Sequence, residues 1–187
     1  MKPTVLVPIA DGTEEIEAVC IIDVLRRADI EVTVARVATR DNQSLEIVAS
    51  RGVLLRAEME VAACSEENFD AIILPGGLPG AEHLRDDPTL TSLLKRHHEN
   101  GKILAAICAA PAVILQHHGL IGEHRATCYP GMMNDLPAAS RSSERVVSNG
   151  TLITSRGPGT ALEFSVELVK VLCGSQKGED IAAQLLV

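Results

Sequence analysis

Aromatic residues are nearly absent from this sequence. Its 187 residues include no Trp, one Tyr and two Phe, which together make up 2% of the chain. Proteins that bind single-stranded nucleic acid need several aromatic side chains on which bases stack, so this class is nearly excluded. Hydrophobic residues still make up 46% of the sequence, which argues against a disordered chain. The core must therefore be built mainly from Val, Ile, Leu and Ala.

Positive charge is also in short supply. The chain has 17 Lys and Arg against 25 Asp and Glu, a formal net charge of −8. This balance argues against electrostatic binding to nucleic acid or to an acidic membrane as the main role. No apolar run reaches the roughly 18 residues of a membrane span, and the N-terminal residues lack the sections of a signal peptide. We expect a cytoplasmic protein with no membrane contact and no specific nucleic acid partner.

Motifs for metals, nucleotides and disulfides are missing as well. The sequence has no C-x-x-C, no zinc-type Cys/His spacing, no G-x-G-x-x-G and no P-loop. We therefore expect neither a metal nor a cofactor. The cysteines are scattered and odd in number, which argues against a disulfide framework. They are Cys20, Cys64, Cys108, Cys128 and Cys173, and the question is which thiol, if any, carries out chemistry.

Short apolar runs alternate with helical patterns along the chain. The apolar runs predict buried strands at 5–9, 31–37, 71–74, 103–107 and 152–154, and a hairpin formed by 45–48 and 53–55. Helical patterns cover 14–28, 88–100, 111–117, 160–173 and 179–185, and 119–145 is irregular. Asp87 with Pro88 predicts one helix start, and Thr160 with Glu163 predicts another as a capping box. We expect a single α/β domain over residues 1–187, with a mostly parallel sheet and helices on both faces.

Cys108 is the strongest candidate for chemistry. In such folds the ligand site lies beyond the carboxyl ends of the strands, and Cys108 directly follows the apolar run 103–107. A strand, one nucleophilic residue, small residues and then a helix form the layout of a nucleophile elbow. The N–H groups at the start of that helix favour a thiolate. The alternative is a small thiol buried in a tight turn.

Glu17 is the second candidate. The residues one and two turns further on, Cys20, Ile21 and Val24, are apolar, so Glu17 falls on the inward stripe of its helix. Burial there would raise the pKa of its carboxyl, and a protonated carboxyl can donate a hydrogen bond to a thiolate. The alternative is an acid in the first turn that interacts favourably with the helix dipole.

Two glycines follow the strand at 71–74. The N–H groups of Gly76 and Gly77, after Pro75, could face an oxyanion. The alternative is a loop that needs unusual backbone angles, and by itself this pair is a weak signal.

Four segments together resemble a known family. They are ADGTEEIE at 10–17, LPGG at 74–77, AAICAAP at 105–111 and TSRGPGT at 154–160. These segments resemble the ThiJ/PfpI superfamily and, within it, the DJ-one branch, and the resemblance covers essentially the whole chain. It implies a flavodoxin-like three-layer sandwich and a homodimer. It also implies a glyoxalase III or deglycase-type activity without a cofactor, or a redox-linked chaperone.

The resemblance also implies roles for individual residues. Cys108 would be the nucleophile, readily oxidised to sulfinic acid, and Glu17 would form a hydrogen bond with its sulfur. The backbone N–H groups of Gly77 and Ala109 would hold an oxyanion. Arg51 would reach the site from the partner subunit, and Arg156 would help to order the same neighbourhood.

The chain departs from the family pattern at Tyr129. The best-known members of the branch have a His before the Pro at this point, whereas this chain has Tyr129 before Pro130. The departure leaves a Cys108–Glu17 pair, with the Tyr129 hydroxyl as a possible polar partner. Ala109 stands where the protease branch has a His after the nucleophile, and no H-x-E follows Cys108, which argues against peptidase and amidotransferase activities.

Two hypotheses remain, and both depend on the thiol of Cys108. In the first, the chain is an enzyme that acts on methylglyoxal or on early glyoxal adducts of proteins or nucleotides. In the second, it is a redox-sensing chaperone in which oxidation of the thiol to sulfinate is the signal, without essential turnover.

Overall fold

A seven-stranded sheet forms the middle layer of the protein. The structure, a computed structural model, describes residues 2–39 and 44–187. The strand order is β5-β2-β1-β6-β7-β9-β8, and every neighbouring pair is parallel except β8 and β9. The strands are β1 (Thr4–Ile9), β2 (Glu31–Arg36), β5 (Met59–Glu60), β6 (Ala71–Leu74), β7 (Ile103–Ile107), β8 (Val146–Asn149) and β9 (Leu152–Ser155). A separate antiparallel hairpin consists of β3 (Glu46–Val48) and β4 (Leu54–Arg56).

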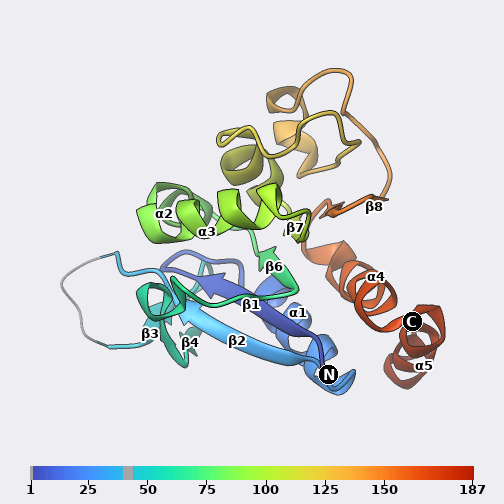
Figure 1. The fold of residues 1–187 in the computed structure, drawn as a ribbon, viewed down its shortest axis with the longest axis horizontal. Coiled ribbons are helices and arrows are strands. Elements are labelled where there is room, and N and C mark those ends of the chain that lie inside the picture. Colours follow the sequence, from blue (N-terminus) through green and yellow to red (C-terminus); the bar gives the residue numbers. More distant parts are fainter. Residues whose placement is uncertain (1, 40–43) are drawn as a thin grey trace.

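Helices cover both faces of this sheet (Figure 1). One hydrophobic cluster joins α1 (Glu15–Arg27), α4 (Ala161–Cys173) and α5 (Ser175–Leu185) to inward side chains such as Val7 and Ile73. A second cluster joins α2 (Gly80–Asp86), α3 (Pro88–Glu99) and the π-helix η2 (Pro111–Gln116) to Leu6 and Leu74 on the opposite face. Neighbouring residues of one strand therefore point into different layers, as the pleat of a strand requires. The predicted three-layer α/β sandwich is confirmed.

Most of the predicted elements are present close to their predicted bounds. The hairpin forms, and helix α3 begins as expected because the Asp87 carboxylate accepts a hydrogen bond from the Leu90 N–H (2.7 Å). The structure adds helix α2, strand β5, the edge strand β8 and three short 3₁₀ helices, η1 (Val61–Cys64), η3 (Pro130–Asp135) and η4 (Pro158–Thr160). Helix α5 begins at Ser175, four residues before the predicted start at 179.

The predicted capping box at Thr160 is wrong. The Thr160 side chain does not cap helix α4. Its hydroxyl instead bonds to the hydroxyl of Ser155 (2.7 Å) and donates to the carbonyl oxygen of Gly157 (2.9 Å). Glu163 is also engaged elsewhere, because its carboxylate pairs with Arg145 (2.7 Å). These tertiary partners outcompete the local cap and tie the loop after β9 to the sheet.

No helix in residues 2–39 and 44–187 is long and apolar enough to cross a membrane.

Candidate active site

Cys108 lies on a sharp turn at the carboxyl end of β7. Its φ of +63° is in the left-handed region, which a residue with a side chain seldom adopts. The turn is held from both sides, because the Cys108 N–H donates to the Ser155 carbonyl oxygen (3.0 Å) and the Cys108 carbonyl oxygen accepts from the Tyr129 N–H (2.7 Å). Helix η2 begins three residues later at Pro111. This is the geometry that the nucleophile-elbow interpretation predicts.

Glu17 is completely buried in the first turn of α1. Its Oε2 accepts a hydrogen bond from the Gly76 N–H (2.8 Å). Its Oε1 is also buried and has no N–H or O–H donor among the described residues, and the carboxyl interacts with the Cys108 thiol. The carboxylate of Glu14, which accepts from the Glu17 N–H (2.8 Å), fixes the start of this helix. Glu17 is therefore aimed at the sulfur, as the apolar stripe of α1 predicts.

Gly76 is the residue that lets these two side chains meet. The register of β6 and β7 pairs Leu74 with Ala106, so Gly76 lies beside Cys108, two residues further along each chain. A Cβ at Gly76 would lie 2.7 Å from the Cys108 Cβ and 2.9 Å from the Glu17 Oε2. Real Cβ atoms do not come that close to other atoms, so any larger residue here would push Glu17 and Cys108 apart.

Gly77 follows with a φ of +89°. A Cβ on it would lie 2.4 Å from the Gly12 carbonyl oxygen, so the loop after β6 packs directly on the loop after β1. The N–H groups of Gly77 and Ala109 both interact with the Cys108 sulfur. The two residues that the family resemblance implies for an oxyanion site are therefore placed beside the thiol.

Burial controls the protonation of the Cys108–Glu17 pair. Desolvation raises the pKa of Glu17 to about 7, although the Gly76 N–H and the Cys108 thiol pull it down. Desolvation also raises the pKa of Cys108 to about 12, and the negative charge of Glu17 adds to the effect. The N–H groups of Ala109 and Gly77 lower that pKa but do not outweigh burial. Burial and the Glu17 charge therefore oppose the thiolate that the helix N–H groups favour, and the pair retains a proton.

Of three further predicted residues, the structure shows Tyr129 near the sulfur and gives Arg156 and Arg51 contacts outside the pair. The Tyr129 ring is near the sulfur, because an atom at the Cβ position of Gly157 would contact both Tyr129 Cδ2 (3.8 Å) and Cys108 Sγ (3.9 Å). Arg156 precedes Gly157 in the same loop, and its Nη1 reaches the Ser143 carbonyl oxygen at 3.5 Å. Arg51 lies at the tip of the β3–β4 hairpin, where its N–H donates to the Glu15 carboxylate (2.8 Å) and its side chain is exposed.

Gly157 and Ser155 are parts of the site that were not predicted from the sequence. Gly157 borders the sulfur, and Ser155 accepts the hydrogen bond that holds the elbow. Both lie in the segment at 154–160 that carries the family resemblance, so this motif was the available signal.

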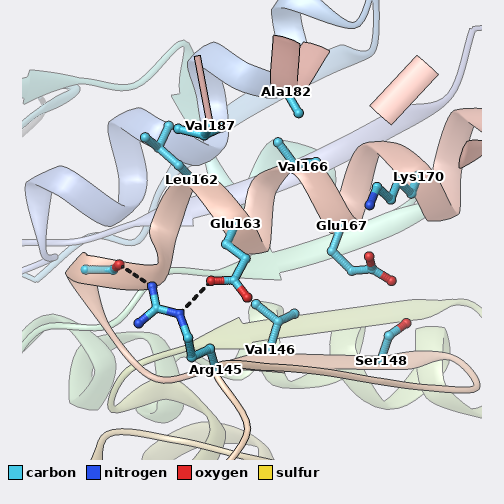
Figure 2. Close-up of a pocket in the computed structure, with 11 residues that line it drawn as sticks. Arg145, Val146, Ser148, Leu162, Glu163, Val166, Glu167, Lys170, Ala182 and Val187 are labelled. Carbon is cyan, nitrogen blue, oxygen red and sulfur yellow. Dashed lines mark hydrogen bonds and ion pairs between the residues drawn. The ribbon is translucent and has the colours of Figure 1, made fainter. Parts of the chain in front are cut away.

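The cavity in Figure 2 lies elsewhere. It has a volume of about 680 Å³ and is formed by α4, β8 and the C-terminal part of the chain, with the Arg145–Glu163 ion pair at one end. It contains none of the predicted site residues. Within residues 2–39 and 44–187, no group of three or more His, Cys, Asp or Glu side chains is placed to hold a metal ion.

The raised pKa of Glu17 predicts a specific dependence of stability on pH. The carboxyl binds its proton more tightly in the folded chain (pKa about 7) than in the unfolded chain (about 4.5), so its contribution is complete below about pH 4.5 and is lost as pH rises through 7. We expect the free energy of unfolding of wild type to fall by about 3 kcal/mol between pH 4.5 and pH 8 through this group, and Glu17→Gln to abolish that fall. Denaturant unfolding at several pH values measures this, with the exposed Glu66→Gln as the control. Parallel curves for wild type and Glu17→Gln would contradict the assignment.

Comparison with known proteins identifies relatives over the whole length of the chain. Protein DJ-1 homolog B of Arabidopsis thaliana is 45% identical over 99% of this chain, which spans 41% of that longer protein. The glutathione-independent glyoxalase DJR-1.2 of Caenorhabditis elegans is 33% identical, with 97% of this chain and 94% of the relative covered. The solved structure described as "Toxoplasma gondii DJ-1, oxidized" is 47% identical, with 98% of both chains covered and a TM-score of 0.94.

A family model also matches most of the chain. Residues 3–171 match the DJ-1/PfpI family, and they include the Glu17 helix, the Gly76–Gly77 loop and the Cys108 elbow. The chain therefore belongs to the DJ-1/PfpI family.

Proposed function

We propose that this chain is a cofactor-independent glyoxalase or deglycase-type enzyme that acts on methylglyoxal or on early glyoxal adducts of proteins and nucleotides. One observation carries the proposal: the carboxyl of Glu17 is buried and interacts with the thiol of Cys108, and its Oε1 has no hydrogen-bond partner among the described residues. The glyoxalase name of the Caenorhabditis elegans relative supports the reaction class.

The first step is addition of the sulfur to the aldehyde. The Glu17 carboxylate takes the proton of the Cys108 thiol while the sulfur forms a bond to the aldehyde carbon of methylglyoxal. Glu17 then passes that proton to the carbonyl oxygen, which becomes the hydroxyl of a hemithioacetal, and the carboxylate is again free to accept a proton. Because burial raises the pKa of Cys108 to about 12, the resting group is a thiol. In this mechanism the adjacent base activates the thiol at the moment of attack. The N–H groups of Gly77 and Ala109 are placed to stabilise the oxyanion.

The second step is a proton transfer within the adduct. Glu17 accepts the proton from the carbon bonded to sulfur, and the electron pair moves onto the ketone oxygen, which gives an enediolate. Glu17 then returns its proton to the neighbouring carbon, while the hydroxyl proton of the first carbon passes to the second oxygen. The product is a lactoyl thioester of Cys108, and water hydrolyses it to lactate and the free thiol. Electrons are only rearranged within the substrate, so no external oxidant or reductant is required. A carboxyl with a pKa of about 7 suits this work, because it both accepts and returns protons near neutral pH.

This mechanism makes two single substitutions informative. We expect Cys108→Ala to abolish lactate formation and Glu17→Gln to lower kcat/KM by about 10²–10⁴-fold, the range typical of a lost general acid–base group. For wild type, kcat/KM should rise with pH through about 7 as Glu17 deprotonates. Lactate production from methylglyoxal measures both effects, and Cys173→Ala, on the outer part of α4, is the matched control.

The redox-sensing chaperone is the second candidate, and the oxidised state of the Toxoplasma gondii relative is the observation that favours it. Its weakness is the raised pKa of Cys108, because peroxide attacks the thiolate. If wild type and Cys108→Ala gave equal lactate, and mild peroxide added oxygen to Cys108 alone, the redox role would replace the enzymatic one.

Either role suits the cytoplasm, because all five cysteines are free thiols, as in a reducing compartment.

We further propose that the chain works as a homodimer through an apolar patch beside the site. The patch consists of five exposed side chains, which are Ile16 and Val19 on α1 and Val48, Val53 and Leu54 on the hairpin. Two backbone hydrogen bonds, Gly12 N–H to Val48 O and Ser50 N–H to Thr13 O (both 2.8 Å), hold the hairpin beside the start of α1. Contiguous exposed apolar surface of this kind marks an interaction site. Arg51, at the tip of the same hairpin, would then face the partner subunit.

The patch gives a direct test of the homodimer. We expect Leu54→Glu, which places a charge on the most exposed member of the patch, to convert the dimer into monomers in sedimentation velocity. Val171→Glu changes a similarly apolar exposed residue on α4 and should leave the dimer intact. A wild-type protein that sediments as a monomer at micromolar concentration would contradict the proposal.

A further inference from the structure

The Tyr129 ring lies between two glycines. A Cβ built on Gly131 would be 3.3 Å from Tyr129 Cε1 and 3.5 Å from Cδ1, and one built on Gly157 would be 3.8 Å from Cδ2. The two edges of the ring therefore face two backbone segments that have no side chains. Tyr129 is 49% exposed, so the rest of the ring is open to solvent at the mouth of the site.

The position of this ring is fixed relative to the sulfur. The Tyr129 N–H donates to the carbonyl oxygen of Cys108 (2.7 Å), and the Tyr129 carbonyl oxygen accepts from the Met132 N–H (2.8 Å) at the start of η3. Pro130 directly after the ring restricts the backbone further. The ring is thus tied to the elbow by its own main chain.

The Cβ position of Gly157 lies within contact distance of both the ring and the sulfur and has room for a methyl group. The Cβ position of Gly157 is 3.8 Å from Tyr129 Cδ2 and 3.9 Å from Cys108 Sγ, and both are ordinary van der Waals distances. The φ of Gly157 is 160°, an extended conformation open to any residue, so the backbone does not require glycine here. What the missing side chain provides is the space itself.

We propose that Tyr129 is a specificity-determining residue whose ring, together with Gly157, bounds a narrow slot over Cys108 that admits small unbranched aldehydes and excludes bulky ones. The slot deepens the proposed function and rests on it for the identity of the substrate. The ring acts through its size and position, and the hydroxyl has no part in the selection. Gly157 keeps the slot open, because a methyl group at this position would contact the sulfur.

Alkylation tests the slot without depending on turnover. Iodoacetamide and its N-phenyl derivative share the same reacting carbon and leaving group and differ in bulk. Their relative rates at Cys108 are measured by mass spectrometry of peptides from protein treated with both reagents. The ratio within one variant cancels any change in the thiolate fraction, because both reagents attack the same thiolate. Cys173, half-buried on α4, is the internal reference, and fully buried Cys64 becomes reactive if a variant unfolds.

We expect wild-type Cys108 to prefer the small reagent more strongly than Cys173 does, and Tyr129→Ala to reduce that preference about tenfold. Tyr129→Phe, which keeps the ring, should retain the wild-type preference. Gly157→Ala should slow both reagents at Cys108 and leave Cys173 unchanged. A wild-type preference in Tyr129→Ala, or its loss in Tyr129→Phe, would overturn the proposal.

The outcome is separable from that of the proposed function. If wild type forms no lactate from methylglyoxal but the reagent preferences follow the expected order, the slot stands and the glyoxalase function falls. If lactate forms at equal rates from wild type and Tyr129→Ala and the reagent preference is also unchanged, the function stands and the slot falls.

Discussion

The contact between the buried carboxyl of Glu17 and the sulfur of Cys108 is the interaction on which the rest of the site depends. Each group is costly to bury in its charged form, and the negative charge of Glu17 raises the pKa of Cys108, whereas the hydrogen bond with the thiol lowers that of Glu17. The pair therefore retains a proton, and that proton can pass between oxygen and sulfur over a short path. Because the Glu17 carboxyl already contacts the thiol, no histidine or metal is needed to activate the sulfur. This explains how the site can have Tyr129 at the position where other members of the branch have a His.

The fold assembles this contact from segments that are far apart in the sequence. Parallel strands place the ends of β1, β6 and β7 at one edge of the sheet, and the register of β6 with β7 sets Gly76 beside Cys108. The absence of a side chain at Gly76 then decides how closely α1 and the elbow approach each other. Tight backbone packing at Gly76 and Gly77 thus has a chemical consequence, because it removes water from the carboxyl and raises its pKa.

The sequence was sufficient to predict the parts of the site that follow from local pattern. Cys108 was predicted from a strand that runs into small residues, and Glu17 from an acid on an apolar helical stripe. The pKa of Cys108 could not be predicted in the same way, because it reflects a balance between burial, the Glu17 charge and two N–H groups from different loops. The sequence pattern indicated the N–H groups and a hydrogen bond from a protonated Glu17, but it did not show the burial of the sulfur, which is the largest cause of the raised pKa.

The same limit explains the errors in the fold. Thr160 and Glu163 have the spacing of a capping box. Thr160 instead bonds to Ser155 across a turn, and Glu163 pairs with Arg145, which is remote in the sequence. The slot beside Tyr129 depends on Gly157, which only the folded chain brings to one edge of the ring. Spacing along the chain predicts what neighbouring residues do, and it does not show which tertiary partner is present.

The central claim is that the thiol of Cys108 is protonated in the resting protein and is activated by Glu17 during attack. The ultraviolet absorbance of the thiolate, recorded as wild type minus Cys108→Ala across a pH titration, tests this claim most directly. The account predicts no thiolate signal from Cys108 at neutral pH. A full signal at or below pH 7 would contradict it, because the sulfur would then be ionised before any substrate arrives.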